Sequence, residues 1–256
     1  MNDSIDFDPR NYQPTAAALE GRTILITGAG SGIGRAVALA CAAARANVVL
    51  VGRTLRKLEA VHAEISARDS GTATIAQLDL ERAIAKDYDT LAAAVLARFG
   101  RLDGLLHNAA LLGNLSAIAD YDVPLFTRVM HVNVTAAFAL TQVLLPALKK
   151  SPDARVLFTS SSVGRRGRAY WGAYAVSKFA IEGLSQTLAH ELGGSTKITV
   201  NTINPGATRT AMRRQAYPAE DLEKLPLPES ITAPYLALLG PVSRGVTGGA
   251  FDAQRT

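Results

Sequence analysis

The chain has 256 residues, of which 48% are apolar, and a formal net charge of +5 at pH 7, which suits one domain with a sizeable core. The positive charge comes from scattered arginines, without a lysine-rich tail or an aromatic–basic repeat, so we expect no nucleic-acid partner. No uninterrupted apolar stretch reaches about 18 residues, the N-terminus shows no secretory signal pattern, and the single cysteine excludes an intrachain disulfide, so we expect a cytoplasmic protein without a membrane partner.

Short runs rich in Val, Ile and Leu alternate with alanine-rich helical patterns along the chain. Residues 1–20 predict a partly ordered N-terminal arm, and residues 21–256 predict a single domain. Strands are predicted at 22–27, 47–51, 73–78, 102–107, 154–160, 198–203 and 247–252. Helices are predicted at 33–45, 55–65, 87–99, 122–150 and 171–192. This alternation is typical of an α/β fold in which a doubly wound parallel sheet of about seven strands has helices on both faces.

A glycine-rich turn follows the first predicted strand. Residues 27–34 read T-G-A-G-S-G-I-G, between an apolar run and an alanine-rich helix. Glycines let the backbone approach a pyrophosphate, and a helix N-terminus supplies free N–H groups and the positive end of its dipole. A glycine cluster alone is often only a turn, but the strand–turn–helix context predicts a dinucleotide site.

The end of the second predicted strand indicates which dinucleotide binds. NAD-binding proteins usually carry an acidic residue about 20 residues after the glycine turn, whereas NADP-binding proteins supply arginine for the 2′-phosphate. Here Gly52 is followed by Arg53, and Arg56 and Lys57 add positive charge. The sequence therefore predicts NADP (NADPH) in preference to NAD, with a solvated Arg53 as the alternative.

Tyr174 and Lys178 lie four residues apart in the predicted helix 171–192. Residues at i and i+4 share a helical face, which brings an ammonium group beside a phenol. A neighbouring cation favours the phenolate and lowers the pKa of a tyrosine. Such a tyrosine can act as a general acid or base. The alternative is a surface tyrosine beside a solvated lysine.

Residues 207–234 contain several prolines and few regular patterns. A long segment of this kind in a compact domain is usually functional, and we interpret it as a substrate lid. An arginine-rich rim that could attract an anionic substrate is predicted from Arg165, Arg166, Arg168, Arg209, Arg213 and Arg214. The alternatives are a solvated rim or arginines paired with acids across a subunit interface. An apolar pocket is a further alternative, lined by Tyr170, Trp171, Met212 and Tyr217.

Together these motifs resemble the short-chain dehydrogenase/reductase family, over nearly the whole chain from Gly21 to Asp252. The matching segments are 27–34, 78–80, 107–110, 131–134, 160–164, 174–178 and 204–210. The sequence around Tyr174 is most similar to that of a bacterial subgroup of uncharacterised oxidoreductases. The resemblance implies a single-domain Rossmann fold and hydride transfer between a nicotinamide and a carbonyl or alcohol carbon.

The resemblance also implies a catalytic tetrad of Asn133, Ser161, Tyr174 and Lys178. In reduction, Tyr174 would donate a proton to the carbonyl oxygen, and Ser161 would hydrogen-bond the same oxygen. Lys178 would lower the pKa of Tyr174 and hold the nicotinamide ribose. Asn133 would position a water that relays protons to Lys178.

The remaining site expectations also follow from the resemblance. His107 and Ala110 depart from the family's Asn-Asn-Ala-Gly segment, and we interpret His107 as a packed or partly solvated histidine. No metal site is expected, and assembly through the two long helices implies a homodimer or homotetramer. The residues implied for cofactor binding are Gly28, Gly30, Ser31, Gly32, Ile33, Gly34, Arg53, Asp79, Leu80, Asn108, Ala109, Tyr174, Lys178, Pro205, Gly206, Thr208 and Thr210.

We therefore expect an NADP-dependent oxidoreductase that acts on a small-molecule carbonyl or alcohol substrate. The competing class is a non-catalytic dinucleotide-binding sensor or scaffold, because a fold does not dictate a function. Such proteins typically lose the catalytic tyrosine, so the presence of Tyr174 with its three partner residues favours the enzyme. The motifs indicate the type of reaction and leave the substrate open.

Overall fold

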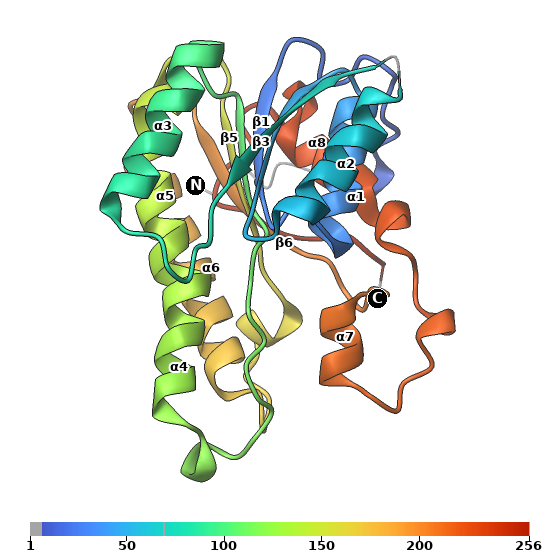
Figure 1. Ribbon diagram of the computed structural model, residues 1–256, viewed down its shortest axis with the longest axis vertical. Helices are drawn as coiled ribbons and strands as arrows, with labels where there is room; N and C mark the ends of the chain where they lie inside the picture. Colours follow the sequence, from blue (N-terminus) through green and yellow to red (C-terminus); the bar gives the residue numbers. More distant parts are fainter. Residues whose placement is uncertain (1–6, 69, 256) are drawn as a thin grey trace.

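The computed structural model describes residues 7–68 and 70–255. Its centre is a parallel sheet of seven strands in the order β3-β2-β1-β4-β5-β6-β7 (Figure 1). The strands are β1 (Thr23–Thr27), β2 (Asn47–Gly52), β3 (Thr72–Gln77), β4 (Gly104–His107), β5 (Arg155–Thr159), β6 (Thr199–Asn204) and β7 (Ala250–Asp252). The predicted doubly wound sheet is confirmed. The chain order reverses between β1 and β4, the place where open α/β sheets bind ligands.

Helices cover both faces of this sheet. In Figure 1, α1, α2 and α8 lie on one side of the strands, and α3, α5 and α6 lie on the other. The helices are α1 (Gly32–Ala43), α2 (Leu55–Ser66), α3 (Ala85–Phe99), α4 (Val123–Met130), α5 (Ala136–Lys149), α6 (Gly172–Leu192), α7 (Ala211–Ala216) and α8 (Thr232–Leu239). Shorter helical turns are η1 (Pro9–Asn11), η2 (Ile118–Asp120), η3 (His131–Thr135), η4 (Ser162–Gly164), η5 (Leu222–Lys224), η6 (Pro228–Ile231) and η7 (Pro241–Ser243).

The central strands are buried on both faces because their side chains alternate between two cores. Leu25 and Leu105 point into the core shared with α3, α5 and α6. Ile24 and Leu106 point into the core shared with α1, α2 and α8. This arrangement explains why the strands read as continuous apolar runs in the sequence.

The predicted long helix 122–150 is confirmed as Val123–Lys149, and η3 interrupts its α-helical pattern with a π-helical turn between α4 and α5. A π turn shifts the apolar pattern by one residue at a single place, a break that periodicity along a long helix does not resolve. The segment Val123–Lys149 has 27 residues and contains an 18-residue window with a mean hydropathy of 1.4, so it could cross a membrane by length and composition alone. Leu140, Leu144 and Leu148 are fully buried in the core shared with α3, α5 and α6, as in the core helix of a globular domain.

Two helices were not predicted. Helix α7 lies inside 207–234, the segment interpreted as a lid. Helix α8 is buried almost all round, so its apolar residues carry no helical period. Within the predicted arm, Leu19 is fully buried and Phe7 and Tyr12 pack against the α1–α8 core, whereas residues 1–6 lie outside the described residues.

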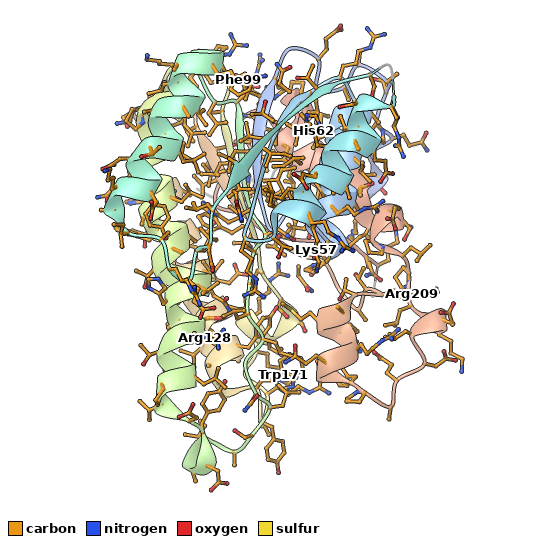
Figure 2. All side chains as sticks on the ribbon, in the orientation of Figure 1. Lys57, His62, Phe99, Arg128, Trp171 and Arg209 are labelled. Atoms are coloured by element: carbon orange, nitrogen blue, oxygen red, sulfur yellow. The ribbon has the colours of Figure 1, made fainter. Side chains whose placement is uncertain are left out.

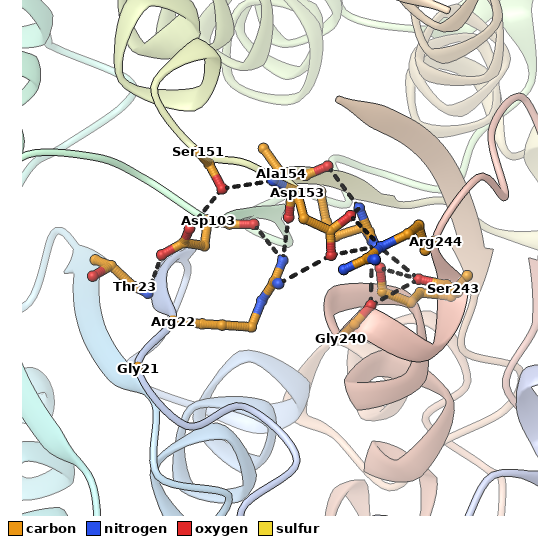
Figure 3. A network of polar contacts seen from close by, with 12 residues as sticks. Gly21, Arg22, Thr23, Asp103, Ser151, Asp153, Ala154, Gly240, Ser243 and Arg244 are labelled. Carbon is orange, nitrogen blue, oxygen red and sulfur yellow. Dashed lines mark hydrogen bonds and ion pairs between the residues drawn. The ribbon is translucent and has the colours of Figure 1, made fainter. Parts of the chain in front are cut away.

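Polar side chains form a network where β1, β4 and β5 begin (Figure 3). Arg22 donates from Nη2 to the carbonyls of Asp103 (3.0 Å) and Asp153 (2.6 Å). The Asp103 carboxylate accepts from the Thr23 backbone N–H (2.9 Å) and the Ser151 hydroxyl (2.6 Å). These bonds link three neighbouring strands at their amino ends. We call this set the amino-edge network; its members are Arg22, Asp103, Ser151, Asp153, Arg155 and Ser243.

Arg155 is the centre of the amino-edge network and is only 1% exposed. Its Nη1 lies 2.8 Å from Asp153 Oδ1. Its Nε donates to the carbonyl of Gly240 and to the Ser243 hydroxyl, both at 3.2 Å. The guanidinium therefore joins the first residue of β5 to the segment that follows α8. Arg244 approaches the same carboxylate from the exposed side, at 3.6 Å.

Candidate active site

A cavity of about 600 Å³ lies at the carboxyl ends of the strands, opposite the amino-edge network. One end lies beside the glycine turn and α2, where Figure 2 labels Lys57; the other holds Trp171 and Tyr174. The predicted cofactor-binding residues that line it are Gly28, Gly30, Ser31, Gly32, Ile33, Arg53, Asp79, Leu80, Asn108, Ala109, Tyr174, Lys178, Pro205, Gly206, Thr208 and Thr210. Only Gly34 of the predicted set is absent from this lining.

The backbone geometry of the glycine turn leaves room and free N–H groups for an anion. Gly28 and Gly32 have φ values of 69° and 54°, in the left-handed region that glycine adopts without strain. Ser31 precedes α1 with extended backbone, and its side chain makes no capping hydrogen bond. The first N–H groups of α1 are therefore left for a ligand in the cavity, as at phosphate-binding helix N-termini.

Gly34 has a packing role. A Cβ atom there would lie 2.3 Å from the carbonyl oxygen of Gly28 and 2.5 Å from Asn108 Nδ2. A larger residue would push α1 away from β1 and β4. The turn is fixed further by Thr27, whose hydroxyl accepts from the backbone N–H of Ala109 at 3.1 Å. Gly34 thus shapes the cradle without facing the cavity.

Arg53 lies at the end of β2 with its side chain 59% exposed. The structure also brings Glu81 near, with Oε2 3.9 Å from Arg53 Nη1. Arg128 holds that carboxylate more closely, at 2.7 Å, and its hydrogen bond keeps the pKa of Glu81 below the ordinary value. Arg53 therefore stays available to a phosphate. Sequence reasoning missed Glu81 as a neighbour of Arg53, because its place beside β2 depends on the order of the strands. The only hint in the sequence is that Glu81 directly follows Leu80, a predicted site residue.

Ser161, Tyr174 and Lys178 meet at the other end of the cavity. Ser161 follows β5, and α6 carries the other two residues. Lys178 Nζ donates to the carbonyl of Thr159 at 2.7 Å and lies 5.5 Å from the centre of the Tyr174 ring. Helix α6 comes this close because residue 164 is glycine, whose Cβ would lie 2.8 Å from Lys178 Cβ.

Burial dominates the pKa values of this pair. It raises the pKa of Tyr174 to about 12, and interaction with the Ser161 hydroxyl opposes the rise. Burial also lowers the pKa of Lys178 to about 8, against the effect of Glu182. The pKa of Tyr174 is therefore above its ordinary value, where the sequence predicted a lowered one, because burial of the phenol outweighs the effect of the neighbouring ammonium. Tyr174 is therefore a protonated phenol near neutral pH, the form that can donate a proton.

Asn133 lies in the π turn η3, away from the main cavity. Its Oδ1 accepts from the backbone N–H of Leu111 (2.7 Å), and its Nδ2 donates to the Leu111 carbonyl and the Ser177 hydroxyl, both at 2.9 Å. It therefore fastens the loop after β4 to α6. A small cavity of about 10 Å³ is lined by Asn133, Thr159 and Lys178, about the room that one water needs. The predicted water relay stays a prediction.

His107 is packed, which decides between the packed and the partly solvated alternatives. Its ring stacks on Phe158 with 4.7 Å between ring centres, and Nε2 lies 2.8 Å from the Thr141 hydroxyl. That hydroxyl also donates to the carbonyl of Ala137 at 2.8 Å. Burial lowers the pKa of His107 to about 3, so the imidazole is neutral at physiological pH.

The arginine-rich rim differs from the prediction. Of the six predicted rim arginines, only Arg168 and Arg213 line the cavity. Arg165 pairs with Glu182 (3.3 Å) and Asp252 (3.0 Å), and the arginines at 209 and 213 each pair with a glutamate of the same segment. These acids lie in the same chain as the arginines. One alternative from the sequence was that the arginines pair with acids across a subunit interface. The predicted apolar pocket residues other than Tyr170 line the cavity, together with Val163 and with Leu112 and Ala216, which belong to no motif.

The chain belongs to the short-chain dehydrogenase family, because the model of that family, "short chain dehydrogenase", matches residues 22–221. It is similar to the uncharacterized oxidoreductase YciK of Escherichia coli (strain K12), with 47% identity over 95% of this chain and 96% of that protein.

Two provisionally assigned short chain dehydrogenases have similar solved structures. The protein from Pseudomonas syringae is 54% identical, with a TM-score of 0.94 over 95% of this chain and 99% of that one. The protein from E. coli CFT073, complexed with NADPH, is 47% identical, with a TM-score of 0.90 over 94% of this chain and 100% of that one. The predicted family and its bacterial subgroup are therefore confirmed.

Proposed function

We propose that this protein is an NADP-dependent dehydrogenase/reductase that interconverts a carbonyl compound and an alcohol. One observation carries the proposal: Ser161, Tyr174 and Lys178 line the same cavity as the glycine turn and Arg53. A cofactor along this cavity would have its phosphates at α1 and its nicotinamide beside Tyr174. The NADPH complex of the E. coli CFT073 protein supports this choice of cofactor.

The bound nicotinamide supplies or accepts the hydride, and the side chains manage the oxygen and its proton. In reduction, the protonated Tyr174 gives its proton to the carbonyl oxygen. The Ser161 hydroxyl donates a hydrogen bond to that oxygen and stabilises its developing negative charge. The nearby positive charge of Lys178 stabilises the phenolate that remains. Asn133 holds the loop after β4 against α6. We also propose that Asn133 positions a water that relays protons to Lys178.

The cofactor preference is tested by Arg53→Ala. Loss of a charge-assisted phosphate contact should weaken NADPH by about 1.5–3 kcal/mol, or one to two decades in Kd. NADH, which lacks the phosphate, should be little affected. Cofactor titration by calorimetry measures both affinities. Arg56→Ala is the matched control, because Arg56 lies three residues away and outside the cavity lining; equal losses of NADH and NADPH in Arg53→Ala would show that Arg53 does not read the phosphate.

The alternative function is a dinucleotide sensor or scaffold without catalysis. A panel of aldehydes, ketones and quinones separates the two classes, because an enzyme oxidises NADPH in their presence and a sensor only binds it. The intact set of Ser161, Tyr174 and Lys178 favours the enzyme. Binding of NADPH with no turnover across the panel would favour the sensor.

We also propose that the protein is a cytoplasmic homodimer or homotetramer. Phe138 on α5 and Val176 and Phe179 on α6 expose apolar side chains on neighbouring long helices. Burying them against a second copy would remove apolar surface from water. Light scattering of the purified protein gives the state directly, and a monomer at micromolar concentration would refute this part of the proposal.

A further inference from the structure

Arg168 is the feature of the cavity that the proposed chemistry leaves unused. It lies in the loop between Ser161 and Tyr174 and lines the cavity at the proton-donating end. Its Nη1 donates to the hydroxyl of Tyr217 at 2.6 Å. Among the described residues it has no acidic partner within ion-pair distance. A guanidinium has five N–H donors, so most of its hydrogen-bonding capacity and its whole charge remain available.

The other arginine at this end is already neutralised. Arg213 donates from Nε and Nη2 to the two carboxylate oxygens of Glu220, each at 2.5 Å. Its guanidinium also lies 3.9 Å from the centre of the Tyr217 ring, whereas that of Arg168 lies at 5.9 Å on the same ring. Two guanidinium groups thus lie against Tyr217. Of these two, only that of Arg168 faces the cavity without a carboxylate partner.

An apolar surface separates Arg168 from the proton donor. The Trp171 ring lies 5.8 Å from the rings of both Tyr174 and Tyr217, tilted by 57° and 45°. Leu112, Val163 and Ala216 pack beneath these rings. A ligand lying on this surface would meet the Tyr174 hydroxyl at one place and the Arg168 guanidinium at another.

We infer that the substrate is an anionic carbonyl or alcohol compound, with an apolar body on Trp171 and a carboxylate or similar anion bound by Arg168. Arginine recognises a carboxylate through parallel charge-assisted hydrogen bonds. This inference rests on the proposed carbonyl chemistry and adds the class of substrate to it.

Matched pairs of compounds test the inference by turnover. 4-Acetylbenzoate and 3-acetylbenzoate each carry a carboxylate across an apolar ring from the carbonyl, and their methyl esters lack the charge. With NADPH, the wild type should favour the acids in kcat/KM. Arg168→Met should reduce kcat/KM for the acids about 10- to 100-fold and leave the esters within about threefold. Esters that are reduced as well as the acids by the wild type would overturn the inference while upholding the reductase.

A binding measurement keeps the test independent of turnover. Trp171 is the only tryptophan in the sequence and lines the cavity, so its fluorescence reports on ligands there. The non-reacting 4-ethylbenzoate should bind the enzyme–NADP complex at least about tenfold more tightly than 4-ethylbenzamide, and Arg168→Met should remove the difference. Equal binding of the two compounds by the wild type would overturn the inference. Tighter binding of the acid together with no turnover of any compound would refute the proposed reductase and leave the anion site intact.

Two control variants separate anion binding from an effect on the lid. Tyr217→Phe removes the hydrogen bond from Arg168 but keeps the guanidinium, so the preference for the acid should persist. Arg166→Met removes an exposed charge from the same loop outside the cavity lining, and it should change neither affinity. If Tyr217→Phe abolishes the preference as fully as Arg168→Met does, Arg168 acts by holding Tyr217 and the inference is wrong.

Discussion

Replacement of Tyr174 by phenylalanine is expected to reduce turnover at least about 100-fold, the lower end of general acid–base contributions. The side chain is buried against Ala175 and Trp171, so the phenyl ring keeps the packing. Only the hydroxyl, which supplies the transferable proton, is lost. NADPH affinity should stay nearly unchanged, because the phosphate contacts lie at the far end of the cavity. Steady-state kinetics and a cofactor titration measure the two effects.

Tyr170→Phe is the matched control for this experiment. Tyr170 is exposed and lies outside the cavity lining, four residues before Tyr174. Its variant should retain wild-type turnover. Activity that survives in a pure Tyr174→Phe preparation would assign the proton donor to another group.

The second large effect is expected at the opposite edge of the sheet. Arg155→Met should lower the free energy of unfolding by about 3 kcal/mol or more, the usual cost of removing one partner from a buried ion pair. The change leaves the Gly240 carbonyl and the Ser243 hydroxyl without this donor, and it removes the closest cation from Asp153. Urea denaturation followed by circular dichroism measures the loss.

Arg244→Met is the internal comparison, because Arg244 approaches the same carboxylate from solvent. Its side chain is 75% exposed and 3.6 Å away, and exposed pairs contribute about 0–1 kcal/mol. Equal shifts in the two variants would mean that burial does not set the strength of the amino-edge network. NADPH affinity of the folded Arg155→Met protein should be normal, since the site lies at the other end of the strands.

Local signals account for the parts of the site that could be predicted. The glycine turn and the pair Tyr174 and Lys178 are each contained within a few residues of sequence. Ser161 joins them because β5 ends and α6 begins at the same edge of a parallel sheet. These features need only the strand–helix alternation, which the apolar runs and alanine-rich segments make visible.

The parts that could not be predicted depend on the whole fold. The pKa of Tyr174 rises because surrounding elements bury the phenol, which spacing to Lys178 cannot reveal. Glu81 reaches Arg53 only because β3 lies beside β2. Pairing of the rim arginines with acids requires the path of the segment after β6. In each case the path of the chain, and no local motif, brings the deciding neighbour close.

The π turn at Asn133 fixes how α5 is rotated about the helix axis relative to α4. A π turn holds one residue more than a regular turn, and each residue rotates a helix by about 100°. Loss of a single residue between α4 and α5 would therefore swing Leu140 out of the core or draw Asn133 away from Ser177. The fold and the site together hold this stretch to a fixed length. Descendants of this sequence can exchange its side chains far more freely than they can add or remove one.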